Sequence, residues 1–271
     1  MGHRRSVLWP DRRIKPPYGS VEIDWGHPLA QGLVLYAPMN NGAGVPSLLT
    51  PGALTVVGSA LAWTGSPVGL GVVGDGASAY SIPAPITSYP FTMASWFRVT
   101  ADGAALALLT LADTAGTTNY HYLVARMADG DQLHMRTYNG TAATGTVGKI
   151  VLGVDYFGAG VVESAEARWA YLNGIVGATQ TTSKTPTSLD TFGVGAVVHS
   201  SSTAHFVGNI YGSAIWSRAL SVADLSWLYA DPYCFLRPVI RRSYGFVGAA
   251  APAAGIRRVF RSPVFGGLTV R

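Results

Sequence analysis

Charged side chains are scarce in this sequence of 271 residues. Asp, Glu, Lys and Arg make up only 12% of it, about half of the share that is usual in soluble proteins. We therefore expect a surface covered by small polar residues, or one that is partly buried against other chains. No apolar run reaches the roughly 18 residues of a transmembrane helix, and no apolar run follows the basic N-terminus. We expect neither a signal peptide nor contact with a membrane.

Cysteine is almost absent. The single cysteine, Cys234, excludes an internal disulfide framework and a cysteine-based zinc site, and we interpret it as a buried or incidental thiol. What the sequence does contain is 48% hydrophobic residues, enough for a substantial core, together with 33 glycines and 16 prolines. This composition predicts many turns and few long helices.

Basic residues are concentrated at the two ends. Residues 1–15 carry a net charge of +4 and residues 237–271 carry +7, whereas the 221 residues between them carry −6. Such segregation indicates that the ends dock on an acidic partner. Because the basic residues are mixed with Pro, Val, Ile and Phe, as in "IRRVFRSPVF", a protein partner is favoured over nucleic acid. The predicted partner contacts are Arg4, Arg5, Trp9, Arg12, Arg13, Arg237, Arg241, Arg242, Arg257, Arg258 and Arg261.

The chain divides into three predicted parts. Residues 1–30 form an extended, proline-rich basic arm, residues 31–236 contain about twelve predicted strands, and residues 237–271 form a second extended basic arm. Turn sequences such as Asn139-Gly140 and Asn173-Gly174 separate the strands. No crossover helices lie between them, which excludes a parallel α/β fold and predicts an antiparallel sandwich or barrel.

The last predicted strand runs directly into a short helix. Residues 209–217 alternate with a period of two, and Ser221 then precedes Asp224 by three residues. A hydroxyl and a carboxylate at this spacing are typical of a helix start. Leu225, Leu228 and Tyr229 form one apolar face, and a helix of about two turns must end before Pro232.

These motifs resemble the laminin-G-like, concanavalin A-like jelly-roll superfamily over roughly residues 31–232. The similarity is carried by "GLVLYAPMN", "VVGDGASAYSIP", "PFTMASWFRV", "WAYLNGIVG" and "NIYGSAIWSRALSVADLSWLYADP". The resemblance implies an all-β, antiparallel, two-sheet jelly-roll sandwich whose short C-terminal helix caps the open edge. The flanking sequences are similar to jelly-roll proteins of tailed bacteriophages and prophages.

Catalysis is not expected. Glucanases of this fold carry Glu-x-Asp-x-x-Glu on one strand, and the sequence has no such stretch; the pair Glu163 and Glu166 lies in a predicted hairpin turn. Nor does a Gly-x-Ser-x-Gly motif occur. Four histidines on predicted strands are interpreted as surface or interface residues: His121, His134, His199 and His205.

Two kinds of binding site are considered on the sandwich. Tyrosines and asparagines at one rim could stack on sugar rings and bind hydroxyls, and the candidate residues are Asn119, Tyr120, Tyr122, Tyr138 and Asn139; the alternative is that these tyrosines pack across strands or on neighbouring subunits. No cofactor is predicted, although the resemblance implies that Ca²⁺ could bind at the rim through Asp75, Asp129 and Asp131.

The combination predicts a phage-type virion protein. The arms would attach it to major capsid or tail proteins, as a homo-oligomer in a virion lattice, and the sandwich would decorate or cement the surface. The alternative is a host-surface adhesin that binds cell-surface glycan, and a more remote one is a glucanase-like hydrolase.

Overall fold

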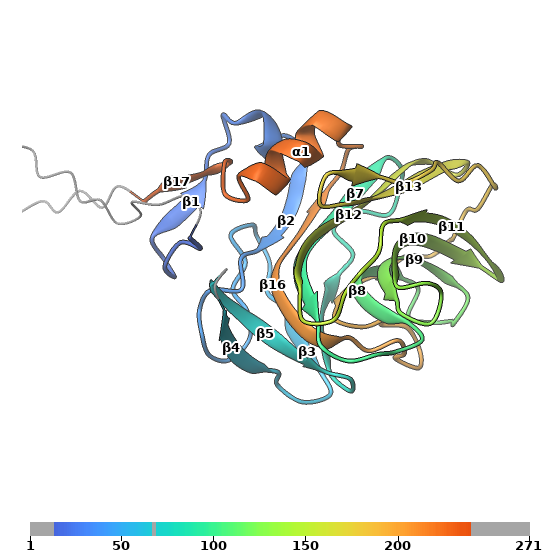
Figure 1. Ribbon diagram of the computed structural model, residues 1–271, viewed down its shortest axis with the longest axis horizontal. Helices are drawn as coiled ribbons and strands as arrows, with labels where there is room; N and C mark the ends of the chain where they lie inside the picture. Colours follow the sequence, from blue (N-terminus) through green and yellow to red (C-terminus); the bar gives the residue numbers. More distant parts are fainter. Residues whose placement is uncertain (1–13, 67–68, 240–271) are drawn as a thin grey trace, which may run out of the picture. The chain divides into compact units, whose positions relative to one another are not determined.

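The computed structural model describes residues 14–66 and 69–239. Within them, two antiparallel sheets pack face to face (Figure 1). This confirms the predicted all-β sandwich of the jelly-roll type with one short C-terminal helix. The predicted arm contacts Arg4, Arg5, Trp9, Arg12, Arg13, Arg241, Arg242, Arg257, Arg258 and Arg261 lie outside the described residues.

The first sheet has seven strands. In spatial order they are β11 (Thr141–Val147), β10 (Gln132–Asn139), β9 (Asn119–Arg126), β8 (Leu106–Ala112), β15 (Thr191–Val194), β6 (Ala79–Pro83) and β3 (Thr55–Val57).

The second sheet has eight strands. Their order is β14 (Ile175–Val176), β13 (Ala167–Leu172), β12 (Asp155–Ser164), β7 (Phe91–Val99), β16 (Val207–Trp216), β5 (Gly69–Asp75) and β4 (Ala62–Ser66), and β2 (Leu33–Ala37) pairs with the far end of β16. Five strands were not predicted: β4, β11, β14 and the two strands of a small ribbon, β1 (Val21–Ile23) and β17 (Leu236–Pro238).

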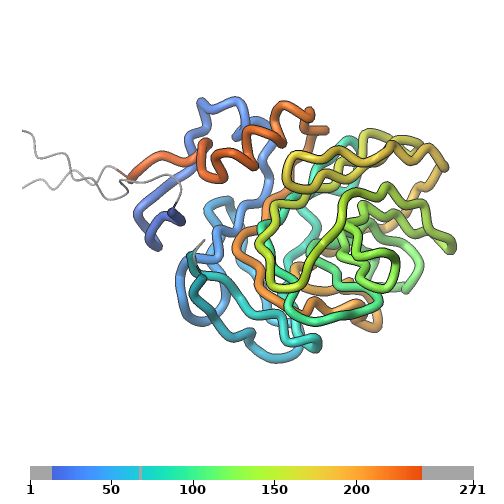
Figure 2. The backbone as a smooth tube through the Cα atoms, in the orientation of Figure 1, coloured from blue at the N-terminus to red at the C-terminus, as the bar shows by residue number. Residues whose placement is uncertain are grey.

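The main core lies between the sheets. In β7, Phe91, Met93 and Phe97 alternate with residues of the opposite face and point into this core, where they meet leucines of β8 and β9. The chain can be followed through both layers in the tube drawing (Figure 2). Alternation of this kind buries one face of each sheet against the other.

A second core covers the outer face of the eight-stranded sheet. Helix α1 (Val222–Ala230) and the 3₁₀ turn η1 (Pro28–Ala30) place Leu225, Leu228 and Leu29 against side chains of β7, β12 and β16. The helix therefore lies on a sheet face, where it buries apolar surface that the main core leaves uncovered; the expectation that it caps an open edge was wrong. Tyr229, predicted on its apolar face, is 44% exposed.

The helix begins as its sequence predicts. The Ser221 hydroxyl accepts from the Asp224 amide, and the Asp224 carboxylate accepts from the Ser221 amide, each at 3.1 Å. Together they form the capping box, which satisfies two backbone donors that a helix start leaves free.

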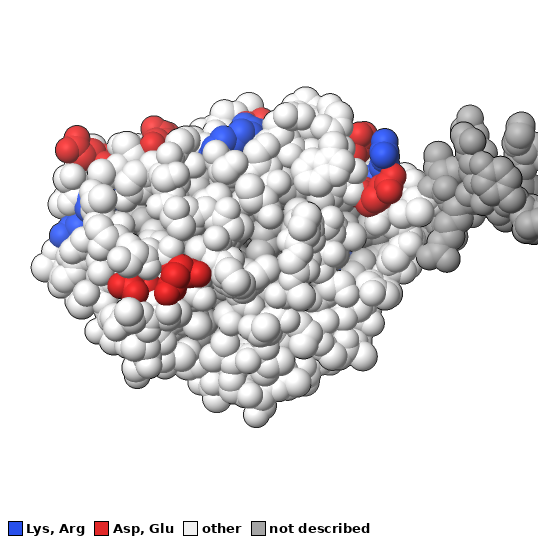
Figure 3. Space-filling view, turned by 180° about the vertical axis from the view of Figure 1, so that it is seen from behind, with Lys and Arg blue, Asp and Glu red and all other residues white. Residues whose placement is uncertain are grey.

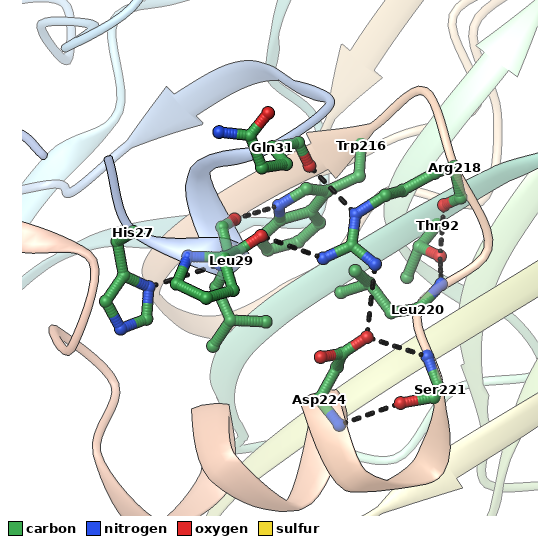
Figure 4. A network of polar contacts seen from close by, with 10 residues as sticks. His27, Leu29, Gln31, Thr92, Trp216, Arg218, Leu220, Ser221 and Asp224 are labelled. Atoms are coloured by element: carbon green, nitrogen blue, oxygen red, sulfur yellow. Dashed lines mark hydrogen bonds and ion pairs between the residues drawn. The ribbon is translucent and has the colours of Figure 1, made fainter. Parts of the chain in front are cut away.

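Arg218 connects this helix to the N-terminal segment (Figure 4). Its guanidinium donates to the carbonyl oxygens of Gln31 at 2.8 Å and Pro28 at 3.2 Å, and also to Asp224 at 3.1 Å. The Trp216 indole N–H donates to the Leu29 carbonyl at 2.7 Å. Trp216 and Arg218 thus hold the segment before β2 against the end of β16 by hydrogen bonds.

Residues 14–30, predicted to be part of an extended arm, pack on the sandwich. Val21, Ile23 and Leu29 are at most 3% exposed, and β1 pairs with β17. Lys15 is buried as well, and its ammonium donates to the carbonyl oxygens of Met39, Leu70 and Tyr211. Arg237, a predicted partner contact, forms an ion pair with Glu22 at 2.9 Å.

Candidate ligand-binding site

Three tyrosines gather on the outer face of the seven-stranded sheet. Tyr120 and Tyr122 lie two residues apart on β9, and Tyr138 of β10 stands directly opposite Tyr120. Because strand residues alternate between faces, all three side chains point away from the main core. The rings of Tyr120 and Tyr138 are stacked, with centroids 5.1 Å apart and planes 16° apart, while Tyr122 meets Tyr120 at 69°.

These tyrosines line a pocket of about 470 Å³, named here the tyrosine pocket. Its remaining lining comes from the loop before β8, from β9 and β10, and from the loop between β15 and β16; these residues are Ala104, Ala105, Arg126, Arg136, Val197, Thr203 and Ala204. Tyr122 packs against Val197, so the second loop forms one wall. The three predicted tyrosines are therefore brought together in one concave site, as a binding site requires.

The strand beside the pocket, β11, carries small side chains on the same face. The β11 residues that pair with Tyr138 and Arg136 are Ala142 and Thr144, and their side chains are small. A planar or extended ligand could therefore continue from the pocket across β11 without meeting a large side chain.

The two predicted asparagines are not part of this pocket. Asn119 and Asn139 pair with each other at the next register position, so their side chains leave the sheet on the opposite face. The Asn139 amide is engaged there and donates to the Thr185 carbonyl at 2.8 Å. Asn119 and Asn139 are thus excluded from the candidate site.

Two arginines of the pocket were not predicted. Arg126 shares the face of Tyr122 on β9, and Arg136 shares the face of Tyr138 on β10. The same period of two that groups the tyrosines places these arginines beside them, so the sequence carried the necessary signal. Arg126 is paired with Asp129 at 2.6 Å, whereas the Arg136 guanidinium lies over the Tyr122 ring, 6.0 Å from its centroid.

The environment keeps the phenols of Tyr120 and Tyr122 protonated. Burial, with the neighbouring Tyr122 and Tyr138 phenols as smaller causes, raises the pKa of Tyr120 to about 12. Burial also raises the pKa of Tyr122. At neutral pH these hydroxyl groups are therefore hydrogen-bond donors as well as acceptors.

Two of the four histidines expected at the surface are buried. His121 is 1% exposed and His134 is 5% exposed. Burial lowers the pKa of His121 to about 3 and that of His134 to about 4, and in His134 the nearby Arg126 guanidinium acts in the same direction. Both imidazoles are neutral at physiological pH.

The three aspartates considered for calcium are engaged in other contacts. The Asp75 carboxylate accepts from the amides of Ala77 and Ser78, Asp129 pairs with Arg126, and Asp131 lies 3.9 Å from the Lys149 ammonium. Across residues 14–66 and 69–239, no three His, Cys, Asp or Glu side chains form a group suited to a metal ion.

A second pocket, of about 210 Å³, lies beside α1 on the outer face of the eight-stranded sheet. Aromatic rings dominate its lining, which consists of Trp96, Asp155, Tyr156, Phe157, Asn173, Tyr211, Tyr229, Pro232 and Tyr233. Its carboxylate, Asp155, already accepts two hydrogen bonds from Arg98, both at 2.7 Å. The one carboxylate in the lining of this pocket is thus engaged within the protein.

Comparison with solved structures agrees with the fold. Domain 4 of AbnA, a GH43 extracellular arabinanase from Geobacillus stearothermophilus solved in complex with arabinotriose, matches with a TM-score of 0.62 and 19% sequence identity; the match covers 73% of this chain and 98% of that domain. Trypanosoma rangeli sialidase matches with a TM-score of 0.55 and 15% identity, over 75% of this chain and 33% of the sialidase. This chain therefore spans about a third of the sialidase.

Sequence comparison identifies the family. No curated protein shows a significant match to the chain. Within the described residues, no helix is long and apolar enough to cross a membrane. A family model described as the concanavalin A-like lectin/glucanases superfamily matches residues 73–226, which include both strands that carry the tyrosines. The chain belongs to the concanavalin A-like lectin/glucanase superfamily.

Proposed function

We propose that this protein is a carbohydrate-binding domain and that the tyrosine pocket is its binding site. The observation that carries the proposal is the convergence of Tyr120, Tyr122 and Tyr138 on one open, concave surface of the sheet. Aromatic rings offer flat apolar faces, and their hydroxyl groups remain available for hydrogen bonds. A sugar ring, with C–H groups on its faces and hydroxyls around its edge, complements both.

The comparison with AbnA supports the proposal. The AbnA domain was solved with arabinotriose bound, so a sandwich of this fold and size accommodates an oligosaccharide. The two proteins share only 19% identity, so the ligand position proposed for the present chain rests on its tyrosines alone.

We propose binding without catalysis. Glycoside hydrolysis requires two carboxylates that face each other across the cleaved bond. No Asp or Glu lines the tyrosine pocket among the described residues, and the nearby Asp129 is paired with Arg126. Glu163, considered above, accepts a hydrogen bond from the Trp169 indole at 2.9 Å. A glycan bound in the pocket would therefore be released without being cleaved.

A glycan array tests this function. The wild-type protein should bind a defined subset of glycans, and Tyr138→Ala should weaken that binding at least tenfold because it removes a stacking ring of the pocket. Tyr18→Ala is the matched control, since Tyr18 is 61% exposed and does not line the pocket. Equal binding by Tyr138→Ala and the wild type would exclude this site.

A second candidate function, attachment to a virion, is favoured by the charge of the chain ends. The strand pair β1–β17 brings the two ends of the described chain together, and the Val239 amide donates to the Ser20 carbonyl at 2.9 Å. In sequence, the basic segment 1–13 precedes this ribbon and the basic segment 240–271 follows it. A single patch of acidic protein, such as a major capsid or tail protein, could then engage both.

Binding to purified phage particles tests the second function. The full chain should bind at low salt and dissociate at high salt, because its contacts are electrostatic. A chain limited to residues 14–239 keeps the ribbon and both cores, and it should lose at least tenfold in affinity. If residues 14–239 bind as tightly as the full chain, the basic ends are not the anchor.

A further inference from the structure

The arginines of the described chain differ in how their charge is compensated. Arg98, Arg126, Arg218 and Arg237 each contact a carboxylate, and the buried Arg168 donates to the carbonyl oxygens of Thr182 and Ala165. Arg136 has no carboxylate within ion-pair distance among residues 14–66 and 69–239. Its guanidinium lies over the Tyr122 ring instead.

The position of Arg136 makes this charge available to a ligand. The side chain lines the tyrosine pocket, and its Nε atom is buried without a hydrogen-bond partner. A buried N–H donor without an acceptor is costly. An anionic group bound in the pocket would supply that acceptor and could form two parallel hydrogen bonds with the guanidinium.

The neighbouring groups add no negative charge. Asp129 is neutralised by Arg126, and the phenols of Tyr120 and Tyr122 are protonated. His134 is neutral because burial, and to a smaller degree the charges of Arg126 and Arg136, lower its pKa. The site as a whole therefore has a positive charge. Charge is otherwise sparse on the molecule, and most of the face shown in Figure 3 carries uncharged side chains.

We propose that the tyrosine pocket selects acidic glycans, with Arg136 binding a carboxylate or sulfate group while Tyr120 and Tyr138 contact the sugar ring. This inference rests on the proposed carbohydrate-binding function and specifies its ligand class. An acidic sugar uses both features of the pocket, the apolar ring faces and the uncompensated guanidinium, whereas a neutral sugar leaves the second one unused. Arg136 is then the residue that determines specificity.

Matched pairs of glycans test the inference. Binding is measured by titration calorimetry with 3′-sialyllactose and lactose, with galacturonate oligomers and their methyl esters, and with sulfated and unsulfated N-acetyllactosamine. The wild-type protein should prefer the acidic member of at least one pair by tenfold or more, and the pair concerned distinguishes carboxylate from sulfate. The preference should shrink as the NaCl concentration rises.

Variants assign the preference to Arg136. Arg136→Gln should remove it, and Arg136→Lys should retain part of it, because lysine keeps the charge but not the two parallel hydrogen bonds. Lys149→Gln is the control for net charge, since Lys149 is 73% exposed and lies outside the pocket. Thermal unfolding confirms that each variant is folded before it is titrated.

The outcomes separate the two proposals. The inferred preference for acidic glycans is overturned if the wild-type protein binds acidic and neutral members equally, or if Arg136→Gln keeps the preference. Either result would leave the proposed carbohydrate binding intact. Wild-type protein that binds no member of any pair would overturn the proposed function together with this inference.

Discussion

His121 illustrates at the scale of one residue how the core constrains the chemistry of a side chain. Its ring lies edge-on to Phe91 and Tyr89, with centroids 5.0 and 5.6 Å away, and its Nδ1 atom is 2.8 Å from the Thr137 hydroxyl. Burial lowers its pKa to about 3, and the charge of Arg168 contributes in the same direction. Protonation in the folded state would place a charge between aromatic rings.

The stability of the protein should fall in acid because of this residue. In the unfolded chain a histidine binds a proton near pH 6.5, whereas folded His121 does so only near pH 3; between these values the unfolded state binds more protons. The free energy of unfolding should therefore be unaffected by this residue above pH 6.5. It should drop by about 1.4 kcal/mol for each pH unit between pH 6.5 and about pH 3, and no further below that.

Urea unfolding at pH 7 and pH 4.5 measures this effect. The double variant His121→Phe/Thr137→Val removes both hydrogen-bonding partners, so neither buried group is left alone. Its loss of stability between the two pH values should be smaller than that of the wild type by about 2–3 kcal/mol. An unchanged loss in the double variant would assign the acid sensitivity to other groups.

At the scale of one element, helix α1 depends on contacts outside its own backbone. It has only nine residues, too few to be stable alone in water. Leu225 and Leu228 are fully buried against the eight-stranded sheet, and Arg218 joins Asp224 at its first turn to the carbonyls of Pro28 and Gln31. The helix and η1 therefore stabilise each other through one guanidinium.

Replacing Arg218 should loosen both elements at once. Arg218→Met keeps the length of the side chain but removes its donors, and we expect a loss of about 1–3 kcal/mol in the free energy of unfolding. Hydrogen–deuterium exchange should rise in residues 28–31 and 222–230 together. Ser221→Ala is the comparison, because it removes only the cap, at a cost of about 1 kcal/mol, and should affect the helix alone. If Arg218→Met raises hydrogen–deuterium exchange in the helix alone, the coupling between α1 and η1 is contradicted.

At the scale of the whole molecule, the sandwich is larger than the segment that defines its family. The family model matches residues 73–226, but β1, β2 and η1 lie before this range and contribute buried side chains to the second core. Trp216 and Tyr36, each at most 1% exposed, belong to this second core. The packed structure thus extends beyond the family match on both sides, as far as the β1–β17 ribbon.

Truncation tests this boundary. Residues 14–239 should unfold with the same free energy as the full chain. Residues 31–236 should lose several kcal/mol, since burying each large aliphatic side chain contributes about 1.5–3 kcal/mol and Val21, Ile23 and Leu29 are removed together. Equal stability of the two truncated chains would show that residues 14–30 are dispensable.

Strong periodic patterns made much of this fold predictable. Large apolar residues in alternation identified twelve strands, and Ser221 with Asp224 identified the start of α1. Strand β11 was missed because its sequence, Thr141–Val147, is mostly Ala, Thr and Gly and shows no apolar alternation. Pairing with β10 and packing close to β13 define it: a Cβ atom on Gly145 would lie 2.9 Å from the Cα of Trp169.

The candidate site was predictable only in part. Tyrosines two residues apart on one strand share a face, and the pairing of Tyr138 with Tyr120 follows from the Asp129-Gly130 turn region that joins β9 to β10. The loop between β15 and β16, which supplies Val197 and Thr203 as a wall, is distant in sequence and carries no signal for its position. The same holds for the packing of residues 21–30, because the side chains that bury them belong to elements distant in sequence.

The most direct test of the central claim is the location of a bound glycan. Backbone amide chemical shifts, or hydrogen–deuterium exchange, should be measured with and without the glycan that binds most tightly on the array. We predict changes confined to β9, β10 and the loop around residues 197–204, with the largest at Tyr120, Arg136 and Tyr138. Changes confined instead to the pocket of Trp96 and Asp155 beside α1, or no localised change, would contradict the account.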